Sequence, residues 1–546
     1  MEAPFTIPRT PEAYAYPLLI GQILKSAQTC SAEQEIVHGE RRHTYAQLQE
    51  RVARLGSALK SLGIAAGDTV AVMDWDTHRY LEAYFAVPML GAVLMTANFR
   101  LSAEQLAYTL NHSGAKAILV NAEFLPMLEA IRPHLRTVDR FVLLDDGKSA
   151  AIPPGFCGEY EELVDSGDPQ HQFADFDENT RATIFYTTGT TGAPKGVYFS
   201  HRQIVVYVLA VTAALASGAN HARVHREDVY MPITPMFHVH AWGFPYMATM
   251  LGLKQVYPGR YTPERLLALI RGEKVTFSHC VPTVLHMVLS HPATDVQDLR
   301  GWKVVIGGSA LSGGLAALAR ARGIDIFTGY GMSETCSAVT VGRVGTGDEE
   351  SLAARTAAGY PTPLVQLRVV DAQMNELPHD GSAAGEVVAR APWLTQGYFN
   401  NPEASASLWS SGWMHTGDIG VLDARGKLVL TDRIKDVIKS GGEWVSSIQL
   451  EDLISRHPEV SETAVVGVPD AHWGERPCAF VVGKAGTALQ AATIRDHLAA
   501  FAHSGEISRF AIPERIELVE TLPKTSVGKL DKKRIREQLA GERTAP

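Results

Sequence analysis

Amphipathic helical patterns alternate with short apolar runs along much of the chain, and no other feature constrains its fold as strongly. Residues 44–63 predict a capped helix, because apolar side chains recur every three or four positions from Leu48 to Leu62. The runs that follow predict further strands and helices at 68–73, 80–90, 117–120, 141–144 and 304–306. Such alternation places parallel strands beneath covering helices, so we predict an α/β fold.

The texture of the sequence changes beyond about residue 364, where the predicted strands shorten and turns become denser. Strands at 385–389 and 426–430 predict a small β-rich subdomain there. A compact α+β unit is predicted after residue 433, with a helix at 448–455 and strands at 463–468, 479–482 and 516–519. Because 546 residues exceed the usual size of one domain, we predict domains over residues 1–432 and 433–546.

Composition restricts the partners and the compartment. A net charge of −9 argues against a nucleic-acid partner. The five cysteines are scattered and odd in number, which argues against a disulfide framework and favours the reducing cytoplasm. The N-terminal residues do not have a signal-peptide pattern, and no long apolar run predicts an integral membrane segment.

A loop rich in glycine and threonine follows a predicted strand at 183–185, and it predicts a nucleotide-phosphate site. Glycines allow backbone N–H groups to approach phosphate oxygens, hydroxyls add donors, and a lysine adds positive charge. The loop supplies Thr187, Thr188, Gly189, Thr190, Thr191, Gly192 and Lys195. Its spacing excludes a Walker loop, because two residues separate Gly189 from Gly192 and a glycine follows Lys195.

Other motifs follow in chain order. They read Thr328-Gly329-Tyr330-Gly331-Met332-Ser333-Glu334-Thr335, Trp413-Met414-His415-Thr416-Gly417-Asp418, Asp432-Arg433-Ile434-Lys435, Lys439-Ser440-Gly441-Gly442-Glu443-Trp444 and Pro523-Lys524-Thr525-Ser526-Val527-Gly528-Lys529.

With these motifs in this order, residues 15–535 resemble the adenylate-forming superfamily of acyl-CoA synthetases, amino-acid adenylation domains and beetle luciferases. The similarity is closest to the medium- to long-chain fatty acyl-CoA synthetase branch. It implies that a carboxylic acid is activated by ATP and Mg2+ and passed to coenzyme A. It also implies an N-terminal domain of two parallel-type αβ subdomains and a β-barrel-like subdomain, followed by a small mobile α+β domain.

The resemblance implies roles for individual residues. Nucleotide and coenzyme A contacts are carried over to Gly308, Ser309, Thr328, Gly329, Tyr330, Gly331, Ser333, Asp418, Arg433, Lys435, Lys439, Gly441, Gly442 and Trp444. Glu334 is the implied Mg2+ ligand, and Lys435 lies in a hinge over 432–437. The catalytic residues implied are Lys529, His238, Thr187 and Lys195.

The segment Met236-Phe237-His238-Val239-His240-Ala241-Trp242-Gly243-Phe244-Pro245 resembles the family segment that lines the acid pocket. Val239, Trp242, Gly243 and Gly307 are carried over as pocket residues, with Trp242 as a gate; His240 stands where an asparagine is often found. Residues 231–252 hold no Asp or Glu, so we predict an acid with an uncharged tail.

Alternatives stay open at this point. The acid could be aryl, cyclic or a thioether, or the acceptor could be a carrier protein. A catalytically dead homologue would lack a key charge, whereas Lys195, Glu334, Asp418, Arg433 and Lys529 are all present. A homodimer is compatible with the sequence.

Overall fold

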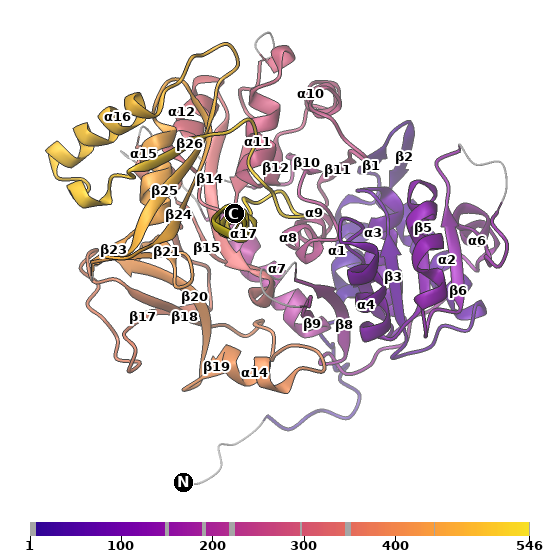
Figure 1. The fold of residues 1–546 in the computed structure, drawn as a ribbon. Coiled ribbons are helices and arrows are strands. Elements are labelled where there is room, and N and C mark those ends of the chain that lie inside the picture. Colours follow the sequence, from indigo (N-terminus) through magenta and orange to yellow (C-terminus); the bar gives the residue numbers. More distant parts are fainter. Residues whose placement is uncertain are drawn as a thin grey trace.

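The computed structural model describes residues 7–147, 152–187, 193–217, 224–294, 298–343, 351–441 and 443–544. Two large sheets stand side by side in the N-terminal part, and a smaller antiparallel sheet and a C-terminal lobe adjoin them (Figure 1). The predicted fold class, αβ layers with a small C-terminal α+β unit, is therefore confirmed.

The first large sheet has seven strands in the order β7-β6-β5-β3-β4-β8-β9, and only the β8–β9 pair is antiparallel. Its strands are β3 (Thr69–Met73), β4 (Val93–Thr96), β5 (Ala115–Asn121), β6 (Arg140–Leu144), β7 (Gly158–Glu159), β8 (Arg181–Tyr186) and β9 (Gly196–Ser200). The strands predicted at 68–73, 117–120 and 141–144 are confirmed here. Every residue of β3 is buried, as expected of a strand covered on both faces.

The second large sheet has nine strands in the order β16-β15-β14-β13-β12-β10-β11-β1-β2. They are β1 (Glu35–His38), β2 (Arg41–Thr44), β10 (Val229–Pro232), β11 (Lys254–Tyr257), β12 (Phe277–Cys280), β13 (Lys303–Ile306), β14 (Asp325–Met332), β15 (Ser337–Val341) and β16 (Tyr360–Pro361). Ile36 of β1 pairs in parallel with Gln255 of β11. The two sheets are thus interleaved in sequence, an arrangement that local patterns do not report.

Helices cover the two large sheets and also occur in the β-rich subdomain and the C-terminal lobe. They are α1 (Ile20–Ser31), α2 (Tyr45–Ser61), α3 (His78–Met89), α4 (Ala103–Ser113), α5 (Leu125–Ile131), α6 (Tyr160–Ser166), α7 (His201–Ala216), α8 (Val239–Trp242), α9 (Phe244–Leu251), α10 (Pro263–Gly272), α11 (Pro282–Leu289), α12 (Gly313–Ala321), α13 (Leu352–Thr356), α14 (Pro402–Leu408), α15 (Ser447–Ser455), α16 (Ala491–Ser504) and α17 (Lys532–Thr544). Helix α2 confirms the pattern at 44–63: Thr44 and Gln47 form a capping box, and Leu48 and Leu59 are buried.

The β-rich subdomain is a five-stranded antiparallel sheet. It contains β17 (Gln366–Val370), β18 (Gly385–Arg390), β19 (Trp409–Ser410), β20 (Trp413–Leu422) and β21 (Leu428–Arg433). Strand β21 begins two residues after the predicted start at 426, because Gly426 has a φ of +77° and lies in a turn. The Asp423 carboxylate accepts backbone N–H groups from Arg425 and Lys427 in that turn.

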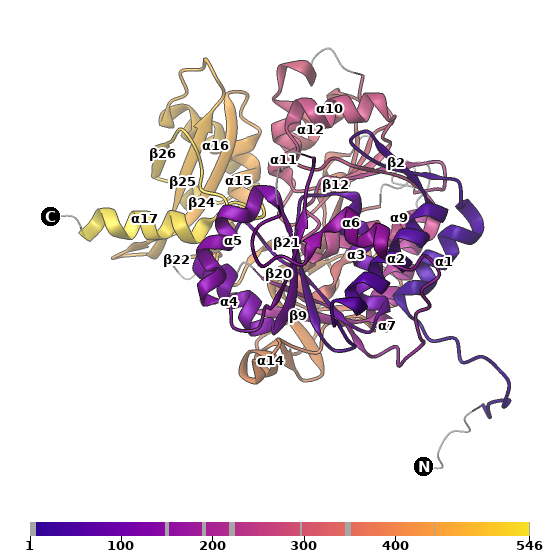
Figure 2. The ribbon, with the colours of Figure 1, turned by 90° about the vertical axis from the view of Figure 1, so that its right-hand side faces the viewer.

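The C-terminal lobe packs α15, α16 and α17 against a mixed sheet, and it stands apart from the rest in Figure 2. Its strands are β22 (Ile438–Ser440), β23 (Glu443–Val445), β24 (Val460–Asp470), β25 (Gly474–Gly483) and β26 (Arg515–Leu518). Leu453, Val465 and Ala479 are fully buried in its core. The lobe contacts the N-terminal part through α12, where the Gly313 N–H donates to Asp452 at 2.6 Å.

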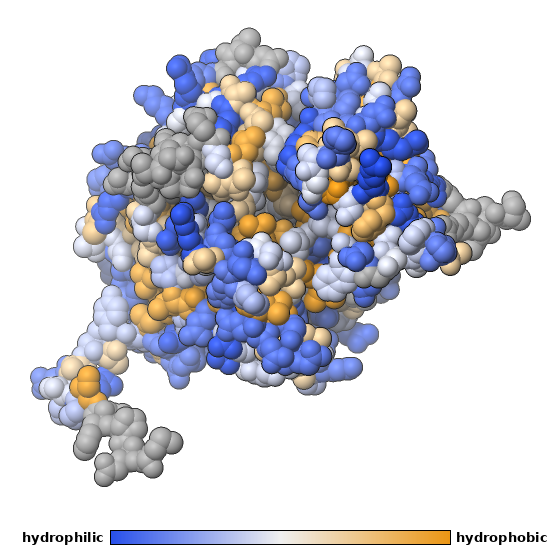
Figure 3. Space-filling view, turned by 90° about the vertical axis from the view of Figure 1, so that its left-hand side faces the viewer, coloured by the Kyte–Doolittle hydropathy of each residue, from blue (hydrophilic) through white to orange (hydrophobic). Residues whose placement is uncertain are grey.

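The molecular face in Figure 3 mixes broad hydrophilic areas with smaller hydrophobic patches. None of the helices in the described ranges combines the length and apolar character that crossing a membrane requires.

Alanine substitutions at two glycines distinguish two energetic costs, that of a left-handed backbone and that of steric crowding. Gly359 and Gly426 have φ of +95° and +77°, but a Cβ on Gly359 would lie 2.3 Å from the Val341 carbonyl oxygen, whereas Gly426 has open space. We expect Gly426→Ala to lower the free energy of unfolding by about 1–2 kcal/mol, the cost of a left-handed alanine. Gly359→Ala should cost about 1–3 kcal/mol more through overpacking. Urea unfolding followed by fluorescence tests this, and equal midpoints for the two variants would contradict it.

Candidate functional site

Ten of the predicted site residues line a cavity at the carboxyl ends of β13 and β14, the usual place for a ligand in an open α/β sheet. Residues predicted from the sequence that line it are His238, Val239, Trp242, Gly307, Gly308, Gly329, Tyr330, Gly331, Ser333 and Lys529. Residues that the sequence analysis missed are Leu215, Phe244, Val305, Met332, Ser337, Ala338 and Val341. The missed residues are mostly apolar, and in the sequence they look like ordinary core positions.

Lys529 reaches this cavity from the C-terminal lobe. A Cβ added to Gly308 would lie 3.0 Å from Lys529 Cε and 3.5 Å from its Nζ, so glycine makes room for the lysine. Burial, with Arg433 nearby, lowers the pKa of Lys529 to about 8, while Asp418 and Glu334 act in the opposite direction. The lysine therefore shares one electrostatic environment with groups from three separate motifs.

Hydrogen bonds from the N-terminal part fix the segment that carries Lys529. Asn98 Nδ2 donates to Ser526 Oγ at 3.1 Å, and Arg100 Nη1 donates to the Ser526 carbonyl at 3.1 Å. Thr283 Oγ1 donates to the Gly528 carbonyl at 2.6 Å. The lobes are thus joined directly at the site.

Glu334 lies in the short turn that follows β14 and is only 6% exposed. Burial raises the pKa of its carboxyl, and the hydrogen bond from Tyr398 and the charges of Lys195 and Lys529 oppose that rise. Tyr398 Oη donates to Glu334 Oε1 at 2.6 Å, and Lys195 Nζ lies 4.7 Å from the centre of the Tyr398 ring. The sequence analysis missed Tyr398, for which the only signal was a glycine–tyrosine pair outside every motif.

Asp418 and Arg433 are direct partners on β20 and β21. Arg433 Nε lies 3.2 Å from Asp418 Oδ1, and Tyr330 Oη donates to Asp418 Oδ2 at 2.8 Å. Three of the predicted contacts, Tyr330, Asp418 and Arg433, therefore form one cluster.

The glycine–threonine loop joins the antiparallel strands β8 and β9, unlike a Walker loop, which leads into a helix. Thr188, Gly189, Thr190, Thr191 and Gly192 lie outside the described residues. At its base, the Thr187 N–H donates to the Lys195 carbonyl at 2.9 Å and the Lys195 N–H donates to Thr187 Oγ1 at 3.3 Å. These bonds close the loop and place Lys195 beside Tyr398.

The segment α8 is a left-handed turn rather than an ordinary helix. Val239, His240, Ala241 and Trp242 have φ of +48°, +53°, +47° and +60°, and each such residue costs about 1–2 kcal/mol. Neither ring nitrogen of the buried His240 has a hydrogen-bond partner among the described residues. Backbone strain and an unsatisfied imidazole together mark a segment that other packing must stabilise.

Trp242, the predicted gate, lines the cavity and packs against Gly307. A Cβ on Gly307 would lie 3.1 Å from the indole Cη2, and Tyr207 Oη donates to the Trp242 carbonyl at 3.0 Å. The cavity holds about 40 Å³. Since ligand pockets are commonly about 300–1,000 Å³, a ligand of that size needs side chains to move.

His238 lines the same cavity. Burial and the neighbouring Lys529 charge lower its pKa to about 3, so the imidazole is neutral at physiological pH. A neutral imidazole can donate one hydrogen bond and accept another.

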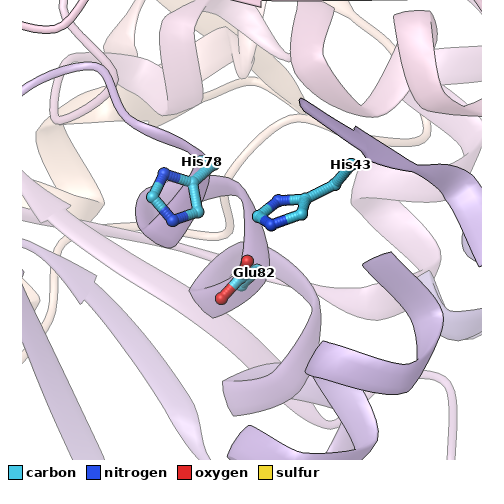
Figure 4. A group of neighbouring side chains, drawn as sticks. All are labelled: His43, His78 and Glu82. Atoms are coloured by element: carbon cyan, nitrogen blue, oxygen red, sulfur yellow. The ribbon is translucent and has the colours of Figure 1, made fainter. Parts of the chain in front are cut away.

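A group of potential metal ligands lies elsewhere, where His43 from β2 faces His78 and Glu82 of α3 (Figure 4). Both Glu82 oxygens are already engaged, by Arg51 Nε at 2.6 Å and by Tyr160 Oη at 2.6 Å. Arg51 would repel a divalent cation, so these residues do not fit a metal. Glu334 fits better, since Mg2+ often takes one or two carboxylates and completes its shell with substrate phosphates and water.

Several predicted contacts lie outside the cavity lining. Thr328 is buried and donates its hydroxyl to the Ala357 carbonyl, while Ser309 is exposed. Gly243 packs against Tyr207.

The predicted hinge lysine and coenzyme A residues follow β21. Lys435 comes shortly after this strand, and burial lowers its pKa. Lys439, Gly441 and Trp444 lie on the β22–β23 hairpin, and Gly442 is outside the described residues. Their roles stay predictions.

Comparison with known proteins agrees with this geometry. Residues 24–399 match the family model described as AMP-binding enzyme, and residues 449–529 match the AMP-binding enzyme C-terminal domain. The chain belongs to the AMP-binding enzyme family. This membership confirms the expectation of an acid–thiol ligase, the reaction class implied by the resemblance.

Two relatives and one solved structure are similar to this AMP-binding enzyme over nearly its whole length. It is 42% identical to the long-chain-fatty-acid–CoA ligase of Thermus thermophilus, covering 91% of this chain and 90% of that one. It is 37% identical to the 3-methylmercaptopropionyl-CoA ligase of Ruegeria pomeroyi, covering 96% and 97%. A crystal structure of an anthranilate CoA ligase with anthranoyl-AMP is similar at 25% identity and a TM-score of 0.86, covering 96% and 99%.

The hydrogen bonds from Asn98 and Thr283 to the segment that carries Lys529 should slow local opening of that segment. In Asn98→Ala/Thr283→Val, hydrogen exchange over residues 525–529 should accelerate about 5- to 150-fold, since the two lost bonds together contribute roughly 1–3 kcal/mol. Asn111→Ala, which loses a surface bond to the His134 carbonyl, is the matched control. Unchanged exchange in the double variant would mean that other contacts seat the lysine.

Proposed function

We propose that this enzyme is a fatty acid–CoA ligase that forms AMP. It activates a medium- to long-chain acid to acyl-AMP and then passes the acyl group to coenzyme A. The observation that carries the proposal is the insertion of Lys529 from the C-terminal lobe into the cavity lined by His238 and Tyr330. There the lysine lies within electrostatic range of Glu334, Asp418 and Arg433.

In the first half-reaction, a carboxylate oxygen attacks the α-phosphorus of ATP while the bond to pyrophosphate breaks. Both reactants are anions, so the barrier is largely electrostatic, and positioned cations lower it. Lys529 takes the carboxylate and α-phosphate oxygens. Lys195, Thr187 and the loop 188–192 take the β- and γ-phosphates. Mg2+, entering with ATP beside Glu334, would neutralise phosphate charge.

The nucleoside has its own contacts in this proposal. Asp418 and Arg433 bind the ribose diol, and Tyr330 presents its ring to adenine along the backbone of 328–331 and 307–309. His238 is neutral and donates one N–H to the carboxylate, which orients the attacking oxygen without adding charge.

In the second half-reaction, the thiol of coenzyme A attacks the adenylate carbonyl, and AMP leaves. We infer that the C-terminal domain, residues 433–546, rotates about the hinge at 432–437 and withdraws Lys529. The hairpin with Lys439, Gly441, Gly442 and Trp444 then receives the pantetheine arm. Few hydrogen bonds hold Lys529's segment, which supports a reversible docking.

The tail of the acid enters past Trp242 when the left-handed turn relaxes. Leu215, Phe244 and Val341 supply apolar surface on the lining, which supports an uncharged chain. A thioether or aryl acid is the second candidate, because a relative with 37% identity is a 3-methylmercaptopropionyl-CoA ligase. Five free cysteines agree with a cytoplasmic enzyme.

The proposal is tested by acid-dependent exchange of labelled pyrophosphate into ATP. A panel should include saturated acids of increasing chain length, 3-methylthiopropionate, benzoate and anthranilate, each with and without coenzyme A. We expect exchange without coenzyme A and AMP release with it, strongest for medium or long chains. A purified enzyme that exchanges pyrophosphate with none of these acids would refute the proposal, and a preference for 3-methylthiopropionate would establish the second candidate.

The two half-reactions should separate in Lys529→Ala. We expect pyrophosphate exchange to fall about 100- to 1,000-fold, as when a preorganised electrostatic donor is removed. Thioester formation from supplied acyl-AMP should remain, because Lys529 has left the site by then. Lys524→Ala is the control: it removes an exposed lysine from the segment that carries Lys529. Lys524 pairs with Glu462, and its loss should leave both activities intact. Equal loss of both half-reactions in Lys529→Ala would contradict its role.

A further inference from the structure

Tyr398 contacts two of the charged groups that the proposed function assigns to ATP. Its hydroxyl donates to Glu334 Oε1 at 2.6 Å, and Lys195 Nζ lies 4.7 Å from the centre of its ring. One side chain therefore touches the groups assigned to the metal and to the terminal phosphates, through two chemically different parts.

The backbone on both sides of Tyr398 is tied to the same two elements. The Thr395 N–H donates to the Glu334 carbonyl at 3.0 Å, and Thr395 Oγ1 donates to the Tyr198 carbonyl at 3.0 Å. The Phe399 N–H donates to the carbonyl of Gly196, the residue after Lys195, at 2.8 Å. The stretch 395–399 thus bridges the turn of Glu334 and the strand that begins at the phosphate loop.

We propose that Tyr398 is a positioning residue that orients the Glu334 carboxylate and the Lys195 ammonium to receive ATP with its Mg2+. The hydroxyl restricts rotation of the carboxylate, since it fixes one oxygen. The ring face attracts the ammonium and keeps the flexible lysine chain above it. This inference rests on the proposed acid activation, because that reaction gives Glu334 and Lys195 their ligands.

The two parts of Tyr398 can be removed one at a time. Tyr398→Phe loses the hydroxyl and keeps the ring, whereas Tyr398→Leu loses both. Binding is measured by calorimetry with α,β-methylene ATP, which cannot form an adenylate, in Mg2+ and in EDTA. The ratio of the two affinities isolates the contribution of the metal and does not depend on turnover.

We expect the affinity gained from Mg2+ to shrink about tenfold in Tyr398→Phe, as for loss of a hydrogen bond to a charged group. Its affinity in EDTA should stay at the wild-type value. In Tyr398→Leu the affinity in EDTA should also fall, by about three- to fivefold, because Lys195 loses the ring. A merely structural role would lower both affinities together and leave their ratio unchanged.

Two controls sharpen the test. Tyr14→Phe removes a similar tyrosine–carboxylate bond, to Asp175 at 2.5 Å, on the exposed N-terminal arm, and it should keep the wild-type ratio. In a Glu334→Gln background, Tyr398→Phe should cause no further loss, because the hydroxyl acts through that carboxylate. A wild-type ratio in Tyr398→Phe, or an equal loss in the Glu334→Gln background, overturns the inference.

The results that would overturn the role of Tyr398 differ from those that would overturn the proposed function. A wild-type protein that exchanges pyrophosphate while Tyr398→Phe keeps its Mg2+ ratio overturns only the role of Tyr398. A wild-type protein that binds α,β-methylene ATP but exchanges pyrophosphate with no acid overturns the proposed function.

Discussion

The structure depends on one electrostatic arrangement: lysines from distant parts of the chain lie near carboxylates that are themselves buried. Lys195 and Lys529 both influence Glu334, and Arg433 and Lys529 both lie near Asp418. Burial alone would favour the neutral form of Glu334, and the cations and the Tyr398 hydroxyl offset that cost. The same arrangement leaves positive charge directed at a cavity, where an anionic substrate can take the place of the missing counter-charge.

The fold supplies these groups from elements that meet only in three dimensions. Glu334 and Tyr330 come from the edge region of the nine-stranded sheet, Asp418 and Arg433 from the five-stranded sheet, and Lys195 from the start of β9. Lys529 comes from the C-terminal lobe. Asn98 and Thr283, from the N-terminal part, donate hydrogen bonds to the loop that carries it. Because these groups come from separate units of the fold, their distances depend on how the units pack against one another.

Much of this arrangement could be predicted from the sequence. Helix α2 and strands β3, β5 and β6 follow directly from apolar periodicity, and most polar cavity residues fall within recognisable motifs. The pairing of β1 with β11 could not be predicted, because local patterns contain no information about distant partners. Tyr398 was missed since a tyrosine after a glycine is common in ordinary turns. The left-handed backbone at Val239–Trp242 was missed because those side chains favour right-handed conformations, and only tertiary packing reverses that preference.

The pairing of β1 with β11 has a consequence for biosynthesis. About 220 residues separate Ile36 from Gln255, so at ribosomal rates of about 5–20 residues per second the first strand emerges some 10–40 s before its neighbour exists. During that interval β1 has only the β2 hairpin to satisfy its backbone. The early chain therefore presents an unfinished sheet edge, which is liable to pair with other strands until β11 has been made.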